Sequence, residues 1–338
     1  MRVLGIETSC DETAAAVLRD GREVVSSVVS SQIALHAEHG GVVPDLAARA
    51  HLEAIGPVVA EALSALEGGW DGIDAVAVTR GPGLAGCLLV GVLYAQGAAL
   101  GRGVPMVGVS HMAGHVYSAW LSDTTLEPPY LALVVSGGHS DVVELRGHGD
   151  ARRLVSTRDD AAGEAFDKAA RLLGLAYPGG PAIELAARGG DPSRFPLPNT
   201  RLDDALSFSG LKTALRYTVR DLGEGSLTDD GTPSDPVVVA DLAAAFQATV
   251  VSQLLHALTT IADRTGAERI AVVGGVAANQ ALREAVTEHF AGLTVSIPPV
   301  SLCTDNAAMI GAAGWHRLAI HGADTSGILV DPVLDEYA

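Results

Sequence analysis

Positive charge is scarce in this sequence. Only 22 of its 338 residues are Lys or Arg, against 40 Asp or Glu, so the formal net charge is −18. All but two of the basic residues are arginine, and the two lysines are Lys168 and Lys212. A chain this acidic is not a general nucleic-acid binder, because its net field repels phosphate groups. An RNA partner would have to meet a local basic patch or an accessory subunit.

Cysteine is also scarce. The three cysteines, Cys10, Cys87 and Cys303, lie far apart in the chain and form no C-x-x-C pair. This pattern is typical of a reduced cytosolic protein and not of a disulfide-stabilised secreted one. We therefore expect a cytoplasmic protein.

Charge is absent from residues 81–101, a stretch long enough to span a bilayer. However, the stretch holds six glycines, begins Gly-Pro-Gly and contains Gln96. It also lies between segments that have an α/β pattern. We expect a buried helix packed on a sheet, and no membrane association, with a membrane span as the weaker alternative.

Strand-like and helical segments alternate along the chain, which indicates an α/β fold with helices covering a mainly parallel or mixed sheet. The strand–turn–strand pattern of residues 2–18 returns at residues 130–145, after a seam rich in turn-forming residues at 121–130. This repetition predicts two similar lobes. The predicted boundaries are 1–120 with a C-terminal helix at about 307–338 for the first lobe, and 121–306 with an insert near 189–236 for the second.

Turns of small residues follow three of the predicted buried strands. They are Thr8-Ser9, Ser136-Gly137-Gly138 and Gly274-Gly275. Such turns let a phosphate approach backbone N–H groups closely, although any single one is usually only structural. Three of them in two similar lobes favour a nucleotide clamped in the cleft between duplicated lobes, the RNase H-like arrangement of the actin, sugar-kinase and chaperone-ATPase superfamily. The sequence has no Walker motif and no G-x-G-x-x-G after a strand, which weakens the P-loop and Rossmann alternatives.

Two histidines, His111 and His115, stand four residues apart after a strand-like run. On a helix this spacing puts both rings on one face, as in H-E-x-x-H, but Met112 replaces the glutamate of that motif. Ser110 can cap the helix, and the positive helix end favours neutral rings that can bind a metal. The residues alone leave open a metal pair or an ordinary polar helix face.

Nine blocks of sequence together resemble the TsaD family, formerly called O-sialoglycoprotein endopeptidase. Each block is modest alone, but they occur in order from residue 5 to about residue 311, and they resemble the family's bacterial branch. The blocks are GIETSCDET, GGVVPDLAARAH, GPGLAGCLLVG, HMAGH, LVVSGGHS, DDAAGEAFDKAARLLGLAYPGGP, SFSGLKTA, GGVAAN and CTDNAAMIG. The resemblance implies a tRNA N6-adenosine threonylcarbamoyltransferase. Such an enzyme moves threonylcarbamoyl from threonylcarbamoyl-AMP to N6 of the adenosine 3′ to the anticodon, in tRNAs that read codons beginning with A.

The resemblance also implies a metal site. His111 and His115 match two ligands and Asp305 the third, although without the family Asp305 would be taken for a helix N-cap. Two histidines and a carboxylate with open positions suit Fe(II) first and Zn(II) as the alternative. Archaeal and eukaryotic relatives carry a further tyrosine ligand where this chain has Val134, and Tyr130 is poorly placed to replace it. This departure leaves the full coordination of the metal open.

An adenylate site follows from the same resemblance. Asp167 would accept hydrogen bonds from the ribose, Glu184 would line the nucleoside, and Asn279 would contact the adenosine end. Without the family, Asp167 would be a solvated helix position and Asn279 a helix-start residue. The full predicted substrate-binding set is Ser9, Val134, Val135, Ser136, Gly137, Gly138, His139, Asp167, Gly180, Glu184, Gly274, Gly275 and Asn279; ATP or AMP would occupy the same site.

The transfer needs a base, because the exocyclic amine of adenine is a poor nucleophile and must lose a proton as the new bond forms. Asp11 and Glu12 are the candidates for the base or for positioning the substrate, and ordinary turn acids are the alternative. His139 is a weaker candidate.

Partners and RNA contacts are the least determined features. The resemblance implies tRNA, a smaller paralogue (TsaB), an ATPase (TsaE) and a separate synthase (TsaC or its relative) that supplies the adenylate. The apolar helix at 83–100 is a candidate face for the paralogue, with core packing as the alternative. Two sets of arginines are candidate phosphate contacts, with a solvated charged face as the alternative. They are Arg146, Arg152, Arg153 and Arg158, and Arg188, Arg194 and Arg201.

Three other function classes compete with the transferase. A metalloprotease lacks the glutamate of H-E-x-x-H, and a sugar kinase of the same superfamily does not need the histidine pair. A non-catalytic nucleotide-binding partner subunit would not need the metal residues that this chain retains.

Overall fold

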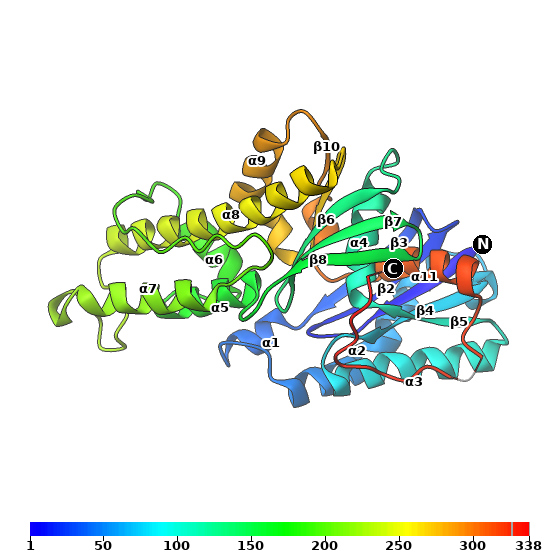
Figure 1. The fold of residues 1–338 in the computed structure, drawn as a ribbon. Coiled ribbons are helices and arrows are strands. Elements are labelled where there is room, and N and C mark those ends of the chain that lie inside the picture. Colours follow the sequence, from blue (N-terminus) through cyan, green and yellow to red (C-terminus); the bar gives the residue numbers. More distant parts are fainter. Residues whose placement is uncertain (326, 338) are drawn as a thin grey trace. The chain divides into compact units, whose positions relative to one another are not determined.

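Two five-stranded sheets organise the chain in a computed structural model that describes residues 1–325 and 327–337 (Figure 1). The chain divides into two units. The first consists of Met1–Pro129, Leu145–Arg152 and Pro298–Ala338, and the second of Tyr130–Glu144 and Arg153–Ile297. Residues 121–129, 145–152 and 298–306 thus belong to the first unit, whereas the sequence boundaries put them in the second lobe.

The first sheet has the strand order β3-β2-β1-β4-β5. β1 pairs antiparallel with β2 and parallel with β4, and β5 continues the parallel part. The strands are β1 (Arg2–Glu7), β2 (Glu12–Arg19), β3 (Glu23–Ser31), β4 (Ala75–Gly81) and β5 (Met106–Ser110).

The second sheet has the strand order β8-β7-β6-β9-β10. Counted along the chain these are its third, second, first, fourth and fifth strands, so the arrangement of the first sheet is repeated. β9 pairs parallel with both β6 and β10. The strands are β6 (Tyr130–Val135), β7 (Ser140–Gly147), β8 (Asp150–Ser156), β9 (Arg269–Val273) and β10 (Thr294–Ser296). The α/β fold with a duplicated sheet, predicted from the repeated strand–turn–strand pattern, is therefore confirmed.

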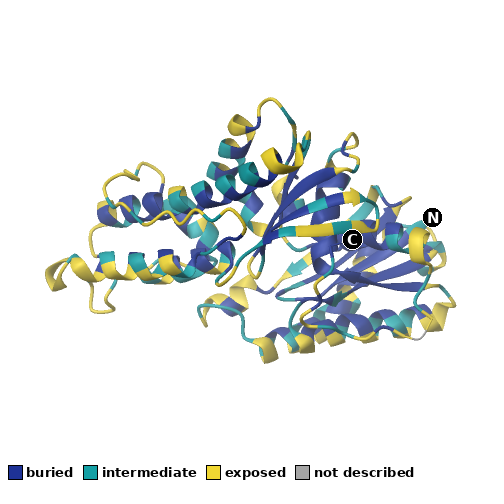
Figure 2. Cartoon of the chain, in the orientation of Figure 1, coloured by how far each residue is buried: buried dark blue, intermediate teal, exposed yellow. Residues whose placement is uncertain are grey.

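Helices cover both faces of the first sheet, which explains why its strands are nearly continuous apolar runs. Val3 faces α4 and α11, whereas Leu4 and Ile6 face α2 and α3. Figure 2 shows β1, β2, β4 and β5 as largely buried, whereas the edge strand β3 and the outer helical faces are exposed or half-buried. The helices of this unit are α1 (Ile33–Ala37), α2 (Pro44–Leu63), η1 (Gly69–Gly72), α3 (Ala85–Arg102), α4 (His111–Ser122), α10 (Val300–Cys303) and α11 (Ala307–His321).

The uncharged stretch forms α3, which is buried on one face only. Cys87, Leu88 and Val92 pack inward, but Leu93 and Leu100 on the opposite face are 56% and 87% exposed. α3 and α8 (Pro236–Thr265) are the two described helices long and apolar enough to cross a membrane by length and composition, and α8 is the more buried. The expected packing of α3 on a sheet is therefore present, together with an exposed apolar face that was not expected.

The second unit adds helices around its sheet. The sequence analysis assigned no element to β3, β8 or α7. Within the predicted insert near 189–236, residues 189–207 have no helix or strand, but α7 and η2 follow. The helices are α5 (Ala162–Leu172), α6 (Gly179–Ala186), α7 (Ser209–Asp221), η2 (Glu224–Ser226), α8, η3 (Gly275–Ala278) and α9 (Gln280–His289).

The segment after α11 returns along the first sheet and is held by polar contacts. Asp324 accepts from the Gly108 N–H at 2.7 Å, and the Arg80 guanidinium lies 3.0 Å from the Glu336 carboxylate. The Ser110 hydroxyl donates to the Glu336 carbonyl at 2.5 Å. Ser110 is the residue that caps α4, so the C-terminal segment supports the start of that helix.

Candidate metal centre and nucleotide site

The histidine pair opens α4. The Ser110 hydroxyl oxygen accepts from the N–H groups of Met112 and Ala113 at 3.2 and 3.5 Å, which is the predicted N-cap. Helix geometry then places His111 and His115 on one face, with ring centroids 4.6 Å apart. The local sequence is sufficient to explain this placement.

Asp305 lies against both rings. Its Oδ1 is 3.5 Å from His111 Nε2 and 3.4 Å from His115 Nε2, and one ligand atom from each of the three residues falls within 4.8 Å of the others. His115 is fully buried, and among the described residues neither of its ring nitrogens makes a hydrogen bond. A buried imidazole without hydrogen bonds is costly unless another ligand satisfies it. The donor set and the unsatisfied ring fit a divalent metal.

Glu7 orients His111. Its Oε2 lies 3.1 Å from His111 Nδ1, and its carboxylate accepts from the Ser9 N–H and the Thr79 hydroxyl at 2.5 and 2.6 Å. A carboxylate at Nδ1 keeps the proton there and leaves Nε2 as the ligand atom. Burial would raise the pKa of Glu7, but His111 outweighs it and holds that pKa below its ordinary value. Sequence reasoning missed Glu7, because it reads as part of an apolar strand.

Proton and metal compete at this centre. Desolvation disfavours imidazolium, but the carboxylates of Asp305 and Glu7 raise the pKa of His111 to about 9. Burial and the neighbouring His111 lower the pKa of His115. Burial would raise the pKa of Asp305, yet the two histidines bring it down to about 2. The centre therefore holds a carboxylate ready to bind a cation.

The predicted acids Asp11 and Glu12 lie in the same unit, at the turn between β1 and β2. Asp11 is buried and Glu12 is half-buried, so neither is an ordinary solvated turn acid. Burial and the carboxylates of Asp305 and Asp11 raise the pKa of Glu12 to about 9. With its pKa raised in this way, Glu12 would have to lose a proton before it could take the predicted role of base.

His51 of α2 supports this turn and was also missed. Its Nε2 donates to the Cys10 carbonyl at 3.0 Å, so its Nδ1 accepts from the Thr13 hydroxyl at 2.7 Å. Burial raises the pKa of the Cys10 thiol, which stays protonated. His51 is the last residue of the block GGVVPDLAARAH, and its place in that block could have identified it from the sequence.

In the second unit, the Ser136-Gly137-Gly138 turn is fastened by the first turn of α5. Gly163 N–H donates to the Ser136 carbonyl and Glu164 N–H to the Gly137 carbonyl, both at 3.2 Å. A Cβ at Gly163 would lie 2.6 Å from the Ser136 carbonyl oxygen, so this contact requires glycine. Gly137 and Gly138 themselves face open space. The turn is held rigid on one side and remains accessible on the other.

Two of the predicted turns meet at one edge of the second sheet. β6 and β9 are parallel neighbours, with Val134 opposite Val273, so their C-terminal turns emerge together. Gly274 has φ +93°, and a Cβ there would lie 2.4 Å from the Val135 carbonyl oxygen. Val134 and Val135 have fully buried side chains, so only their backbone can take the predicted substrate-binding role. His139 accepts from the Ser136 N–H through its carbonyl at 2.9 Å.

The polar residues predicted for the nucleoside are also positioned by backbone. Asp167 Oδ1 accepts from the Gly179 N–H at 2.7 Å at the start of α6, next to Gly180. Asn279 caps α9 and donates to Glu184 at 3.3 Å and to Gln247 at 2.8 Å. The structure thus brings Asn279 and Glu184 together, whereas Ser9 lies in the first unit with the metal residues, its hydroxyl 3.2 Å from His111 Nδ1.

The profile of the TsaD family, described as tRNA N6-adenosine threonylcarbamoyltransferase, matches residues 23–312. The chain belongs to this family. Enzymes of that name from Anaeromyxobacter dehalogenans (strain 2CP-1) and Thermomicrobium roseum are 52% and 50% identical to it. The alignments cover 94% of this chain and 94% of the first enzyme, and 100% of this chain and 96% of the second. The predicted family and enzyme class are confirmed. They are favoured over the metalloprotease, sugar-kinase and partner-subunit alternatives.

The similarity to solved structures concerns the fold of this chain and not its function. Component A of the Acidaminococcus fermentans (R)-2-hydroxyglutaryl-CoA dehydratase has a TM-score of 0.54 at 16% identity, covering 94% of this chain and 99% of that one. Full-length HypF, in a phosphate- and nucleotide-bound form, has a TM-score of 0.61 at 13% identity, covering 96% and 56%. This TsaD family member therefore has the predicted superfamily fold.

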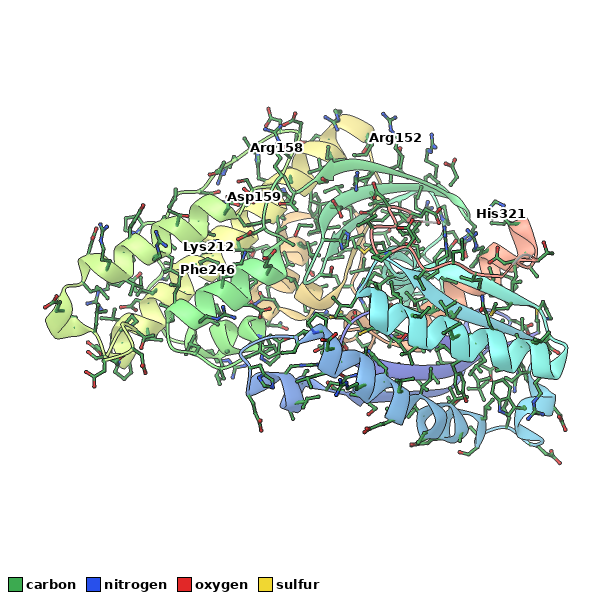
Figure 3. All side chains as sticks on the ribbon, turned by 90° about the horizontal axis from the view of Figure 1, so that it is seen from below. Arg152, Arg158, Asp159, Lys212, Phe246 and His321 are labelled. Carbon is green, nitrogen blue, oxygen red and sulfur yellow. The ribbon has the colours of Figure 1, made fainter. Side chains whose placement is uncertain are left out.

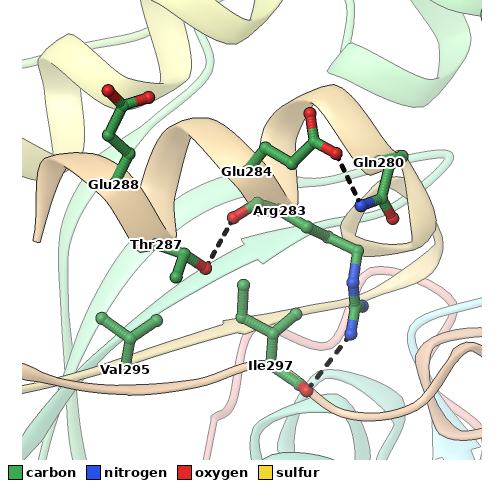
Figure 4. Close-up of a pocket in the computed structure, with 7 residues that line it drawn as sticks. All are labelled: Gln280, Arg283, Glu284, Thr287, Glu288, Val295 and Ile297. Atoms are coloured by element: carbon green, nitrogen blue, oxygen red, sulfur yellow. Dashed lines mark hydrogen bonds between the residues drawn. The ribbon is translucent and has the colours of Figure 1, made fainter. Parts of the chain in front are cut away.

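A groove of about 720 Å³ runs along α9 of this TsaD chain, next to Asn279 (Figure 4). Its Arg283 donates to the Ala277 carbonyl at 3.0 Å and to the Ile297 carbonyl at 3.5 Å, which fixes η3 and hence the Gly274-Gly275 turn. The groove also carries Glu284 and Glu288, so it suits no phosphate. Its lining residues are Gln280, Arg283, Glu284, Thr287, Glu288, Val295 and Ile297.

Several arginines predicted to contact tRNA are already paired with carboxylates. Arg146 lies 2.5 Å from Asp150, and Arg158 lies 3.0 Å from Asp204. Arg194 reaches the buried Asp241 at 2.6 Å and ties the insert to α8. Pairing reduces the charge that these three arginines offer to RNA. Arg152 and Arg153 have exposed side chains on β8.

Proposed function

We propose that this enzyme transfers threonylcarbamoyl from threonylcarbamoyl-AMP to N6 of the adenosine 3′ to the anticodon in tRNAs reading codons that begin with A. The observation that supports it most is the His111–His115–Asp305 cluster, which offers three ligand atoms around one buried point. In the reaction the bond from the carbamoyl carbon to phosphate oxygen breaks, and a bond to N6 forms. AMP leaves, and the N6 proton passes to a base.

His111, His115 and Asp305 would hold one divalent metal, with Fe(II) as the first choice and Zn(II) as the second. When bound, the metal would act as a Lewis acid toward the adenylate phosphate. Glu7 keeps His111 in the tautomer that presents Nε2. Asp11 and Glu12 are proposed to take the N6 proton or to position the substrate, with His139 as a weaker candidate.

The adenylate would be bound largely by backbone groups of the second unit. The N–H groups of Gly137, Gly138 and Gly275 would approach the phosphate. Asp167 would accept from the ribose, and Asn279, with Glu184 and Gly180, would contact the nucleoside. ATP or AMP would fit the same place. Ser9 would contribute from the first unit, and Val134, Val135 and Gly274 through their backbone.

The exposed face of α3 is the proposed contact with the smaller paralogue TsaB. Leu89, Leu93 and Leu100 are 46%, 56% and 87% exposed there, and Leu52 of the adjacent α2 is 65% exposed. Contiguous exposed leucines mark an interaction surface. We further propose that the protein works in the cytoplasm, with the ATPase TsaE and an adenylate-supplying synthase of the TsaC type, and without a membrane.

The test is a transfer assay with purified protein, partner proteins, threonylcarbamoyl-AMP and unmodified tRNA. Wild type is compared with His111→Ala, His115→Ala and Asp305→Ala, and with His39→Ala as an exposed-histidine control. We expect product and bound metal with wild type and the control, and loss of both in the three variants. Turnover by the variants would contradict the metal role, and no product from the complete wild-type system would contradict the proposed function.

A further inference from the structure

The two lysines of this chain lie in one groove. Lys168 and Lys212 line a groove of about 370 Å³ between α5 and α7, together with Arg171 and Arg216. Four of the 22 basic residues thus gather at one place on a chain with a net charge of −18. Leu172 and Thr213 complete the lining. We call this surface the α5–α7 groove.

Helix periodicity produces the groove. On α7, Leu211, Leu215 and Val219 are buried four residues apart. The residue after each of them is basic, so Lys212, Arg216 and Arg220 form a parallel stripe beside the buried one. α5 contributes Lys168 and Arg171, one turn apart, while Ala165 and Ala169 are buried. The two helices run side by side in Figure 1, and Figure 3 labels Lys212 on α7.

Nearby carboxylates compensate only part of this charge. Lys168 Nζ lies 2.9 Å from Asp160 and 2.6 Å from Glu164, and Lys212 Nζ lies 3.4 Å from Asp160. Arg216 is exposed and, within the described part of the chain, forms no ion pair. Lys168, Arg171, Lys212 and Arg216 line the groove, and none of its described lining residues is acidic. The groove along α9, by contrast, is lined by Glu284 and Glu288.

An exposed aromatic ring continues the surface. Tyr217 is 46% exposed, and the guanidinium carbons of Arg216 and Arg220 lie 5.6 and 4.8 Å from its ring centroid. Arginine interleaved with an exposed aromatic is the composition of surfaces that bind nucleic-acid strands. The stripe from Lys212 to Arg220 covers about 12 Å along the helix axis. That length fits a run of phosphates better than one small anion.

We propose that the α5–α7 groove binds the sugar-phosphate backbone of the tRNA substrate, a proposal that rests on the proposed function. Phosphate contacts position an RNA without reading its sequence. The groove would therefore hold the body of any substrate tRNA. An acidic segment of a partner protein is the competing occupant, and the exposed tyrosine favours RNA.

The test measures binding of labelled tRNA to the assembled complex at several salt concentrations. Lys212→Glu/Arg216→Glu is compared with Arg19→Glu/Arg264→Glu, which changes the net charge equally at two exposed arginines outside the groove and outside α3. We expect at least about tenfold weaker binding, and a salt slope reduced by about 1.5 to 2, for the groove variant only. Lys212→Ala/Arg216→Ala should give a smaller loss in the same direction.

Three further readouts separate the outcomes. AMP binding and thermal unfolding of the groove variant should match wild type, which shows that the second unit is intact. Unchanged tRNA affinity of the groove variant, with normal transfer by wild type, would overturn the groove proposal but not the proposed function. The same conclusion would follow if Arg152→Glu/Arg153→Glu, and not the groove variant, lost tRNA binding. Lost assembly with partner proteins in the absence of RNA would show a protein-docking surface and overturn the RNA proposal. Wild type that binds tRNA but makes no product would count against the function and not against the groove.

Discussion

The two units build their candidate sites from different materials. In the first unit the site consists of titratable side chains in a buried place: Glu7, His111, His115 and Asp305 lie against one another. In the second, the turns at Ser136–Gly138 and Gly274–Gly275 offer mostly backbone. A side-chain site fails when one donor is removed, whereas a backbone site fails when an atom is added. The two therefore call for opposite kinds of substitution.

Removing a donor from the first unit should have the largest effect. Asp305→Asn keeps the size of the side chain but removes the charge between the two imidazoles. We expect loss of bound metal and a fall in transfer of more than about a hundredfold, because ligands matter more than their supporting groups. Metal analysis and the transfer assay measure both.

This variant also tests the comparison directly. AMP binding, which we assign to the second unit, should be unchanged in Asp305→Asn. If AMP affinity fell together with the metal, the two sites would not be separable in the way described.

Weakening the support of a ligand should cost less. In Glu7→Gln the amide oxygen can still accept from His111 Nδ1 and the Thr79 hydroxyl, but the charge is gone and the NH₂ group faces the Ser9 N–H. We expect metal affinity about 10- to 100-fold lower, measured by titration with Zn(II). Glu23→Gln, at an exposed carboxylate paired with Arg19, is the matched control and should bind normally.

Adding a methyl group should damage the second unit. Gly163→Ala forces a Cβ against the Ser136 carbonyl, so we expect about 1–3 kcal/mol lower free energy of unfolding and weaker AMP binding. Denaturant unfolding and calorimetric titration measure the two effects. Gly97→Ala on α3, where a Cβ meets nothing within 4 Å, should instead be neutral or stabilising. Equal damage from both substitutions would argue against the close contact at Gly163.

The last prediction concerns stability alone, at a buried histidine outside the metal centre. Burial and the nearby His148 and Arg22 lower the pKa of His316 to about 3, and its Nε2 has no hydrogen bond among the described residues. In the unfolded chain His316 therefore binds a proton near pH 6.5, whereas in the folded protein it binds one only near pH 3. Stability should fall as the pH decreases through this window, by at most about 1.4 kcal/mol per unit.

His316→Leu should flatten this part of the pH dependence. Urea unfolding of both proteins between pH 4 and pH 7 would show the difference. Parallel curves would mean that His316 takes up a proton in the folded protein too.

Sequence motifs identified the residues of the metal centre better than they identified the residues that contact them. His111 and His115 are adjacent on one helix, so their spacing alone places them together. Asp305 required the family, because 190 residues separate it from His115 and no local pattern shows which helix start meets α4. Glu7 was missed for the same reason: its partner is 104 residues away.

The missed helix shows a different limit. α7 has an apolar residue every fourth position from Leu211 to Val219, but the stripe is narrow and flanked by polar residues, so the segment reads as a continuation of the insert. The cations of α7 line a groove only because α5 packs beside that helix. A basic surface shared by two helices cannot be recognised from local arginine density, which pointed instead to a set that includes the carboxylate-paired Arg146, Arg158 and Arg194.

The contact between Ser110 and Glu336 has a practical consequence. An affinity tag fused at the carboxyl end, or proteolytic trimming during purification, would disturb the Glu336 carbonyl that receives the Ser110 hydroxyl, one residue before the last residue that the structure describes. A preparation altered in this way would be folded yet poor in metal, and it could be mistaken for an inactive enzyme. Reagents for this protein are better attached at the amino end, where the Met1 amino group forms an exposed ion pair with Asp20 and the Met1 carbonyl accepts from the Asp20 N–H.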